Sequence, residues 1–249
     1  MKTTRKIVAI GGGELKMLET ADIDRRIIEL TGKTRPKALF IPTASGDPDG
    51  YVETFETCYG KHFGCQTRTL KLIQNPPPFE KMSALVLDSD LIYVGGGNTY
   101  RMMKIWRRLG LDTVLAEAAS RGIVLSGLSA GAICWFKYGH SDSRSFSSNV
   151  AWDYIRVSGL GFINAVYCPH YHHEGREDSF AEMIAKRGGI GIACDNNAAI
   201  EIVGDRYRVL TSAPNAKAYK LFKRNGRAIV RELSQDSEYI PLDDLVRRK

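Results

Sequence analysis

The feature that most constrains the fold is an alternation of short, almost wholly apolar runs with longer helical stretches. Most of the apolar runs lack the polar/apolar alternation of strands with one solvent-exposed face, so they are expected to be strands buried on both faces. The sequence therefore predicts an α/β fold of three layers, a mainly parallel sheet with helices on both faces. The predicted strands are 6–10, 38–42, 68–72, 91–94, 123–126, 165–168 and 191–194, and the predicted helices are 22–31, 51–63, 99–109, 111–120, 130–136 and 177–186.

The pattern changes after residue 198. Short strand-like runs there are joined by Gly-Asp, Pro-Asn and Asn-Gly turns, which favour hairpins. They predict an antiparallel C-terminal extension of the sheet, with strands at 199–203, 207–211, 218–222 and 228–233. No repeat, low-complexity segment or linker divides the chain, so residues 1–249 are expected to form a single domain.

Composition limits the partners and the compartment. The five cysteines are scattered, odd in number and never in a Cys-x-x-Cys pair, which favours a reducing, cytoplasmic location over a disulfide framework. No run approaches a membrane span, and no secretory signal is visible. The net charge of +7 comes from dispersed basic residues, which indicates a solvated surface and not a nucleic-acid partner. The sequence leaves the oligomeric state open and is compatible with a homo-oligomer.

The motif that carries chemistry is Gly-x-Ser-x-Gly at residues 127–131, where a predicted strand ends and a helix begins. A tight turn of this kind presents a nucleophilic serine, Ser129, above the ends of the strands. It also directs the first amides of the next helix toward the same point, so the Ala130 N–H is a candidate oxyanion donor. The alternative is a tight strand–helix turn with an incidental serine.

A second glycine-rich turn, at residues 95–98, follows the predicted strand 91–94. Backbone amides without a side chain can approach a ligand closely, so Gly96 or Gly97 is a candidate for the second oxyanion donor. Asn98 can cap the next helix, and it is counted among the candidate substrate-binding residues. A third run, Gly11–Gly13, lacks the Gly-x-Gly-x-x-Gly spacing of dinucleotide sites, which argues against phosphate binding there.

A serine nucleophile needs a base, usually a histidine. His170 directly follows the predicted strand 165–168 and a proline, and it is the expected base. The neighbouring His172, His173 and Glu174 suggest a metal site, but adjacent histidines in an extended loop point to opposite sides and no further ligand motif accompanies them, so we expect no metal.

The acid that would orient the histidine is left undecided by the sequence. Asp195 follows the predicted strand 191–194, and Asp142 lies after the helix of the serine motif. Both can reach the same crevice, because triads are defined by the roles of their members and not by chain order.

Three motifs in this order, Gly127–Ala132, Gly95–Asn98 and Pro169–Tyr171, resemble the peptidase E family (serine peptidase family S51), which includes aspartyl dipeptidases and, more distantly, cyanophycinases. The resemblance runs from the first strand to about residue 202. It implies a fold like that of class I glutamine amidotransferases, with serine in place of cysteine at the elbow, and peptide hydrolysis without a cofactor.

By this resemblance Ser129 is the nucleophile and His170 the base. Family members place the acid in one of two positions, which correspond here to Asp142 and to Asp195, although the spacing of the second position also fits Asn196. Arg176 stands where aspartyl dipeptidases carry an arginine that recognises the substrate's aspartate side chain, and its guanidinium fork suits a carboxylate.

The expected function is hydrolysis of small peptides, chiefly dipeptides with an N-terminal aspartate, through a Ser-His-acid triad and an acyl-enzyme. The alternatives are an amidase, esterase or cyanophycinase-like hydrolase on the same fold, a non-catalytic small-ligand binding protein, and a nucleotide-binding protein that uses Gly11–Gly13.

Overall fold

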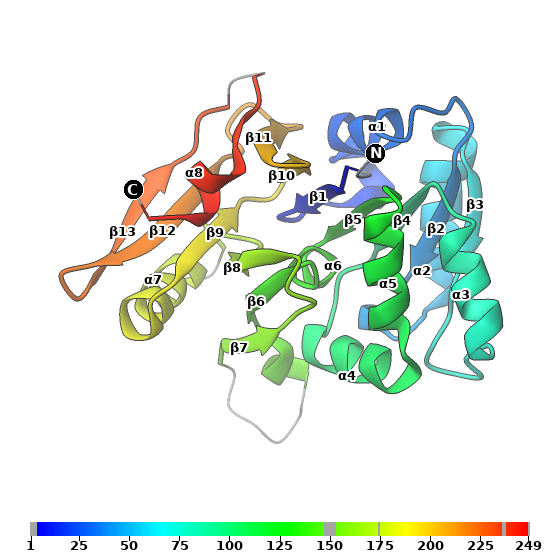
Figure 1. Cartoon of the computed structure of the whole chain (residues 1–249), viewed down its shortest axis with the longest axis horizontal. Helices are drawn as coiled ribbons and strands as arrows, with labels where there is room; N and C mark the ends of the chain where they lie inside the picture. The colour runs from blue at the N-terminus through cyan, green and yellow to red at the C-terminus, as the bar shows by residue number, and fades with distance from the viewer. Residues whose placement is uncertain (1–3, 147–152, 174, 236–237, 249) are drawn as a thin grey trace.

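The computed structural model describes residues 4–146, 153–173, 175–235 and 238–248. They form two sheets that lie side by side, each covered by helices (Figure 1). The eight-stranded sheet has the order β14 (Ile240–Pro241), β11 (Arg206–Thr211), β10 (Ala198–Val203), β1 (Lys6–Ile10), β5 (Val124–Leu128), β4 (Leu91–Val94), β2 (Lys37–Ile41) and β3 (Gln66–Thr69).

The five strands from β1 to β3 in that order pair in parallel. Their carboxyl ends therefore meet at one edge of the sheet, which is where ligand sites form in open α/β folds. The strands β10, β11 and β14 continue the sheet beyond β1 in antiparallel pairs. The predicted antiparallel extension is thus present, and part of it borders the first strand of the chain.

Helices cover both faces of this sheet. In β1 the residues from Ile7 to Ile10 are all buried, and successive side chains enter two different apolar clusters. The cluster that contains Val8 and Ile10 packs against α1 (Ala21–Glu29), α2 (Asp49–Phe55) and the π-helix η3 (Glu56–His62). The cluster that contains Ile7 and Ala9 packs against α3 (Phe79–Leu87), α4 (Thr99–Leu109) and α5 (Leu111–Ser120). The α/β prediction is confirmed by this layering.

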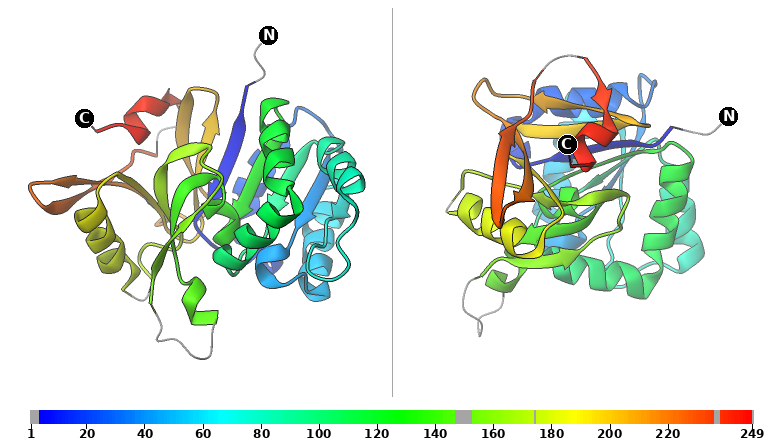
Figure 2. Two further views of the ribbon diagram at one scale, coloured as in Figure 1. Left: turned by 60° about the horizontal axis from the view of Figure 1, so that its bottom comes forward. Right: turned by 60° about the vertical axis from the view of Figure 1, so that its left-hand side comes forward.

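The six-stranded sheet has the order β13 (Arg227–Glu232), β12 (Ala218–Arg224), β9 (Ile190–Cys194), β8 (Ile163–Cys168), β6 (Phe136–Ser141) and β7 (Ile155–Ser158). Its central strands β6, β8 and β9 are parallel, β7 and β12 flank them in antiparallel pairs, and β13 pairs antiparallel with β12. One face packs against α7 (Arg176–Arg187) through Phe180 and Ile184. The sequence predicts one sheet, whereas the structure divides the strands between two, seen from two further sides in Figure 2.

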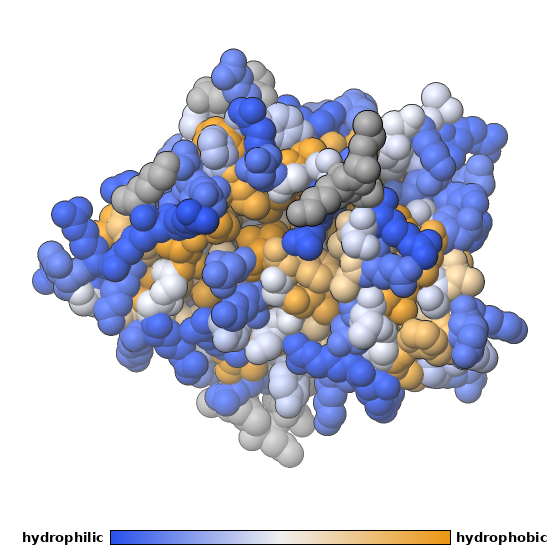
Figure 3. All heavy atoms as spheres, viewed as in Figure 1, coloured by the Kyte–Doolittle hydropathy of each residue, from blue (hydrophilic) through white to orange (hydrophobic). Residues whose placement is uncertain are grey.

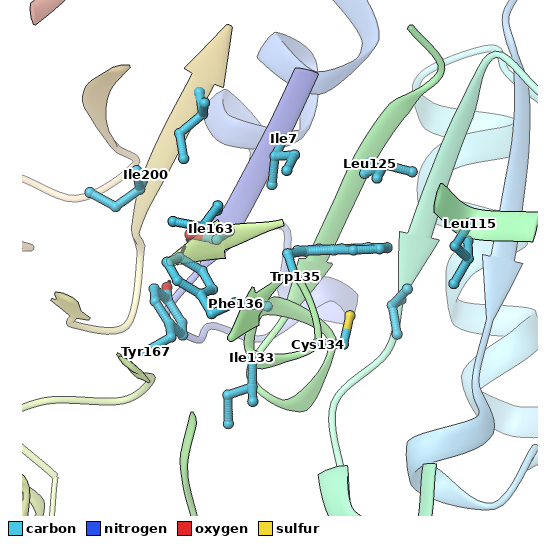
Figure 4. Close-up of a cluster of buried hydrophobic side chains, with 14 of the residues drawn as sticks. Ile7, Leu115, Leu125, Ile133, Cys134, Trp135, Phe136, Ile163, Tyr167 and Ile200 are labelled. Carbon is cyan, nitrogen blue, oxygen red and sulfur yellow. Dashed lines mark hydrogen bonds between the residues drawn. The ribbon is translucent and has the colours of Figure 1, made fainter. Parts of the chain in front are cut away.

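A shared core joins the two sheets. Trp135, Phe136 and Tyr167 are fully buried between strands of the first and second sheets (Figure 4). The Tyr167 hydroxyl donates a hydrogen bond of 3.0 Å to the Ala9 carbonyl, which ties β8 to β1. This contact brings the carboxyl end of β8 near that of β5, and with them the histidine and serine that follow these strands.

Several elements differ from the predicted ones. The predicted helix 51–63 begins at Asp49 and becomes a π-helix from Glu56. The predicted helix 130–136 is the four-residue helix α6 (Ala130–Ile133), because the chain turns there into β6, a strand whose mixed polar sequence shows no apolar run. Elements that the sequence does not predict are β6, β7, β14, α3, α8 (Leu242–Val246) and the short helices η1 (Leu15–Met17), η2 (Thr43–Ser45) and η4 (Ser143–Phe146).

Hydrophilic residues dominate the rim of the face in Figure 3, and apolar residues gather toward its middle. Within the described ranges, every helix is too short or too polar to cross a membrane.

Candidate active site

Ser129 lies between β5 and α6 with φ 57° and ψ −112°, a backbone conformation that non-glycine residues rarely adopt. Close packing holds the turn in this state. A Cβ at Gly127 would lie 2.4 Å from the Gly131 carbonyl oxygen, and one at Gly131 would lie 2.0 Å from that of Val94. Both flanking glycines of the motif are thus required by the close approach of strand, turn and helix. The serine sits at a strained elbow, as expected for a nucleophile.

His170 follows β8 and also has a positive φ of 132°. Its Nε2 lies 2.6 Å from the Ser129 Oγ, a short hydrogen bond. Burial lowers the pKa of the imidazole below its usual value of 6.5, and the Arg176 charge lowers it further, whereas the hydrogen bond with Asn196 opposes this shift. The histidine is therefore neutral at neutral pH and is able to accept the serine proton.

The other ring nitrogen of His170 faces an amide. Its Nδ1 lies 2.8 Å from the Oδ1 of Asn196, which follows β9 by two residues. This contact favours the tautomer with the proton on Nδ1, which leaves Nε2 free to accept from the serine hydroxyl. The structure thus brings together a serine, a histidine and an asparagine.

Neither candidate carboxylate contacts this histidine. The Oδ1 of Asp195 lies 2.8 Å from the Nδ1 of His172, and its Oδ2 accepts from the Lys217 N–H. Asp142 accepts from Arg176 at 3.0 Å. Asn196, the residue after Asp195, contacts the histidine in the place where a carboxylate was expected. The sequence indicates Asn196 only through the spacing of the family motif.

The glycine run Gly11–Gly13 forms the support for the histidine–asparagine pair. A Cβ at Gly12 would lie 2.1 Å from the Asn196 Oδ1 and 2.3 Å from the His170 Nδ1. The Gly12 carbonyl accepts from the Asn197 N–H at 2.9 Å, and Gly12 forms an isolated parallel bridge with Asn196. The first glycines of the run are therefore required for packing at the site, a role that its spacing does not reveal.

Of the predicted oxyanion residues, Gly96 and Ala130 lie beside the serine. A Cβ at Gly96 would lie 3.5 Å from the Ser129 Cβ, so this loop adjoins the nucleophile. The Gly96 N–H donates a long bond of 3.4 Å to the Tyr51 hydroxyl. Gly97 has φ 132° and packs against the Ala44 carbonyl. Ala130 is the first residue of α6, where amides have no carbonyl partner within the helix.

Asn98 is held in structural contacts. Its Oδ1 accepts from the Arg101 N–H at 2.9 Å and caps α4, and its Nδ2 donates to the Ser143 carbonyl at 3.2 Å. The capping role expected from the sequence is confirmed.

Arg176 is the first residue of α7, and its side chain is only 5% exposed. Its Nη2 donates to Asp142, and its guanidinium lies 4.6 Å from the centroid of the Tyr154 ring. The Nε atom is buried and has no hydrogen-bond partner in the described structure. A buried donor without a partner costs free energy, and this atom is closed to the surface of the neighbouring cavity.

Arg176 and the reactive histidine line the same cavity, whose volume is about 430 Å³. Its walls consist of Gly13, Glu14, Glu19, Asp142, Tyr154, His170, His173, Arg176 and Asn196. An adjoining cavity of about 390 Å³ shares three of these residues and is lined by His170, His172, His173, Asp195, Asn196, Asn197, Ala213, Asn215 and Ala216. Space for a small ligand thus lies next to the Ser129–His170 pair.

The metal alternative involves His172, which lies between Asp195 and Glu177 at 2.8 and 3.3 Å. Glu174, the third member of the suggested site, lies outside the described residues. Among the residues that are described, no group of three or more histidine, cysteine, aspartate or glutamate side chains is arranged to hold a metal ion.

The fold and the paired serine and histidine define a serine-type hydrolase of the α/β class. The model of peptidase family S51 matches residues 7–210, and the chain belongs to that family.

One curated relative resembles the chain over most of its length, and another resembles a short segment of it. It is 34% identical over 221 residues to the Bacillus subtilis (strain 168) protein named uncharacterized peptidase YgaJ, which covers 87% of this chain and 92% of the relative. It is 41% identical to peptidase E of Citrobacter koseri over 49 residues, a segment that makes up 20% of this chain and 21% of that protein.

Two crystal structures share the fold. The peptidase from an acI-B1 actinobacterium matches with TM-score 0.69 at 22% identity, over 97% of both chains. The putative peptidase E protein from Listeria monocytogenes EGD-e matches with TM-score 0.64 at 19% identity, over 84% of this chain and 99% of the other.

Proposed function

We propose that this S51 peptidase hydrolyses small peptides, chiefly dipeptides with an N-terminal aspartate, through an acyl-enzyme on Ser129. The observation that carries the proposal is the cavity in which Arg176 and His170 lie together. It combines a buried guanidinium that suits a carboxylate with the histidine that contacts the nucleophile at 2.6 Å. A cavity that contains both groups fits a substrate with an acidic side chain next to its scissile bond.

In the acylation step, His170 Nε2 takes the Ser129 proton while Oγ attacks the scissile carbonyl carbon. Asn196 accepts from the Nδ1–H and keeps the ring in the required tautomer. Because Asn196 is neutral, it orients the imidazolium without supplying a charge to stabilise it, unlike the carboxylate of a Ser-His-Asp triad.

The negative charge on the carbonyl oxygen would be stabilised by the N–H groups of Ala130 and Gly96. Both lie beside Ser129, and the bond of Gly96 to Tyr51 is long enough to be exchanged for a stronger acceptor. Collapse of this intermediate breaks the peptide bond, and His170 gives its proton to the leaving amine. Water, deprotonated by the same histidine, then hydrolyses the acyl-enzyme and restores the serine.

Arg176 would select the substrate. Its guanidinium carries the positive charge of an arginine on the cavity wall, and a charge-assisted hydrogen bond from it to an aspartate carboxylate is stronger than one to a neutral group. Glutamate is longer by one methylene and asparagine lacks the charge, so both should bind less well.

The test is hydrolysis of a panel of Asp-X, Glu-X, Asn-X and β-Asp-X dipeptides by the parent and by Ser129→Ala and Arg176→Ala. We expect cleavage of Asp-X, its loss in the serine variant and a higher KM in the arginine variant. Absence of cleavage across the panel would overturn the dipeptidase assignment. Cleavage of simple esters or amides by the parent would then identify an amidase or esterase on the same fold.

We also infer a cytoplasmic location. The cysteines at 58, 65, 134, 168 and 194 are all buried free thiols, a state that reducing compartments maintain.

A further inference from the structure

The outer hairpin of the six-stranded sheet, β12 with β13 at the left of Figure 1, has two faces of different chemistry. Residues directly opposite each other in an antiparallel pair point to the same side of the sheet, and successive residues alternate between the sides. On one side, Tyr219, Leu221 and Ala228 belong to the apolar cluster that α7 covers. The other side carries three opposed pairs, which are Lys220 with Arg231, Phe222 with Ile229, and Arg224 with Arg227.

Two of these three pairs place positive residues directly opposite each other, an arrangement that destabilises a hairpin by repulsion. Neither strand places a carboxylate on this side to offset the repulsion. Within the described ranges, Arg224 and Arg227 form no ion pair, and both are exposed residues. The face therefore retains positive charge that an anion can neutralise.

The segment that follows α8 brings another arginine to the same face. The Lys220 Nζ donates to the backbone carbonyls of Asp244 and Arg247, and these bonds hold the segment against β12. Arg248 comes next in the chain. The basic residues are dispersed in the sequence, but the hairpin and this segment bring several of them together.

The arginines of the two segments surround one cavity of about 600 Å³. Its walls consist of Phe222, Arg224, Asn225, Arg231 and Arg248. The Arg231 guanidinium lies 4.9 Å from the centroid of the Phe222 ring, which supports it from one side. No acidic residue belongs to these walls, and none of the wall residues lines either cavity beside His170.

We propose that this cavity binds a small ligand with a di- or triphosphate group. Guanidinium groups bind phosphate oxygens through two parallel hydrogen bonds, and these charge-assisted bonds are among the stronger ones in proteins. A phosphate group carries about 1.5 to 2 negative charges at pH 7, against one for a carboxylate. Two or three linked phosphates therefore match three arginines within one small cavity, and their binding also removes the repulsion across the hairpin. The site lies outside the proposed peptidase site and does not depend on that proposed function.

The experiment is calorimetric titration of the full chain with tripolyphosphate and, separately, with ATP, at near-physiological ionic strength. We expect one saturable site per chain in the parent. Arg224→Gln and Arg231→Gln should each weaken binding by about tenfold or more, because each removes a charged hydrogen-bond donor. Both arginines are exposed, so the variants should fold as the parent does. Arg108→Gln, an exposed arginine on α4, makes the same change in net charge and should leave the affinity unaltered.

The two ligands distinguish the sources of the phosphate group. Equal affinities would show that the phosphates alone are recognised, and tighter binding of ATP would show that the nucleoside adds contacts. Absence of saturable binding of either ligand would overturn the proposal. Equal weakening by Arg108→Gln would also overturn it, since the attraction would then come from net charge alone. Binding of a single-stranded oligonucleotide, without binding of tripolyphosphate or ATP, would instead indicate a nucleic-acid surface.

Ser129→Ala separates this site from the peptidase site. The variant should bind tripolyphosphate as tightly as the parent, because Ser129 is not among the residues that line the arginine cavity. Loss of tripolyphosphate binding in Ser129→Ala would place the anion at the serine and contradict the proposal.

Discussion

The Nδ1 of His170 lies 2.8 Å from the Oδ1 of Asn196, so an amide faces the imidazole where many serine hydrolases have a carboxylate. The amide oxygen accepts a hydrogen bond from the Nδ1–H and fixes the tautomer, but it adds no negative charge. Burial keeps the pKa of His170 below its usual value although the hydrogen bond with Asn196 raises it, and the base is therefore neutral at neutral pH.

Replacing Asn196 by aspartate should move the acidic limb of the kcat/KM profile to higher pH. A carboxylate at this position favours the imidazolium, so the pKa of His170 should rise by about one unit or more. The pH dependence of kcat/KM for the parent and Asn196→Asp measures the shift directly. Asn196→Ala should instead lower kcat by about 100-fold or more, since the tautomer is no longer held. Superimposable profiles of parent and Asn196→Asp would show that residue 196 does not act on the base.

Gly12→Ala should disable the site without unfolding the protein. Its Cβ would meet the Asn196 Oδ1 at 2.1 Å and the His170 Nδ1 at 2.3 Å, so the pair must separate. A displacement of about 1 Å in a catalytic group typically costs about 100-fold in rate, and kcat should fall by at least that factor. Gly50→Ala is the control, because a Cβ there meets nothing within 4 Å. Full activity of Gly12→Ala would contradict the supporting role of the glycine run.

The parts of the site that local sequence determines are the parts that could be predicted. Ser129 is marked by two glycines whose absence of a side chain the elbow requires, and His170 by a strand end followed by proline. The same holds for strands such as β1 and β4, whose apolar runs reflect burial on both faces.

The remaining parts depend on contacts between distant segments. Asn196 meets His170 because Gly12, far away in sequence, pairs with the chain after β9, and nothing local distinguishes Asn196 from Asp195. The strand β6 was not predictable, since Phe136–Ser141 becomes a strand by pairing with β7 and β8 and not by its own apolar pattern. The division into two sheets arises from the same kind of long-range pairing.

The strain at Ser129 should be visible in stability as well as in activity. Ser129→Ala removes the nucleophile and should lower kcat by about 10⁴-fold or more. Ser129→Gly should be equally inactive but more stable than the alanine variant by about 1 kcal/mol, because glycine adopts φ 57° and ψ −112° with less strain. Chemical denaturation of the two variants compares them without any effect of catalysis. An alanine variant as stable as the glycine variant would indicate an unstrained elbow.

Asp24 should make the stability of the protein fall between about pH 4 and pH 6. Its carboxyl is fully buried on α1, and burial raises its pKa from 3.8 to about 6, although hydrogen bonds from the Tyr59 and Thr20 hydroxyls oppose the shift. The folded state therefore binds the proton more tightly than the unfolded state. The stabilisation is complete below the unfolded pKa and is lost as the pH rises through the folded one, a change of about 2–3 kcal/mol.

Asp24→Asn removes this titration while keeping groups that can bond to both hydroxyls. The free energy of unfolding of the variant, relative to the parent, should therefore rise by about 2–3 kcal/mol between pH 4 and pH 7. Urea denaturation at several pH values measures the difference, in which the titration of all other groups cancels. Asp22→Asn, on the same helix with a side chain 68% exposed, should show no such trend. A constant difference between parent and Asp24→Asn across this range would mean that the Asp24 carboxyl has a similar pKa in the folded and unfolded chain, despite its burial.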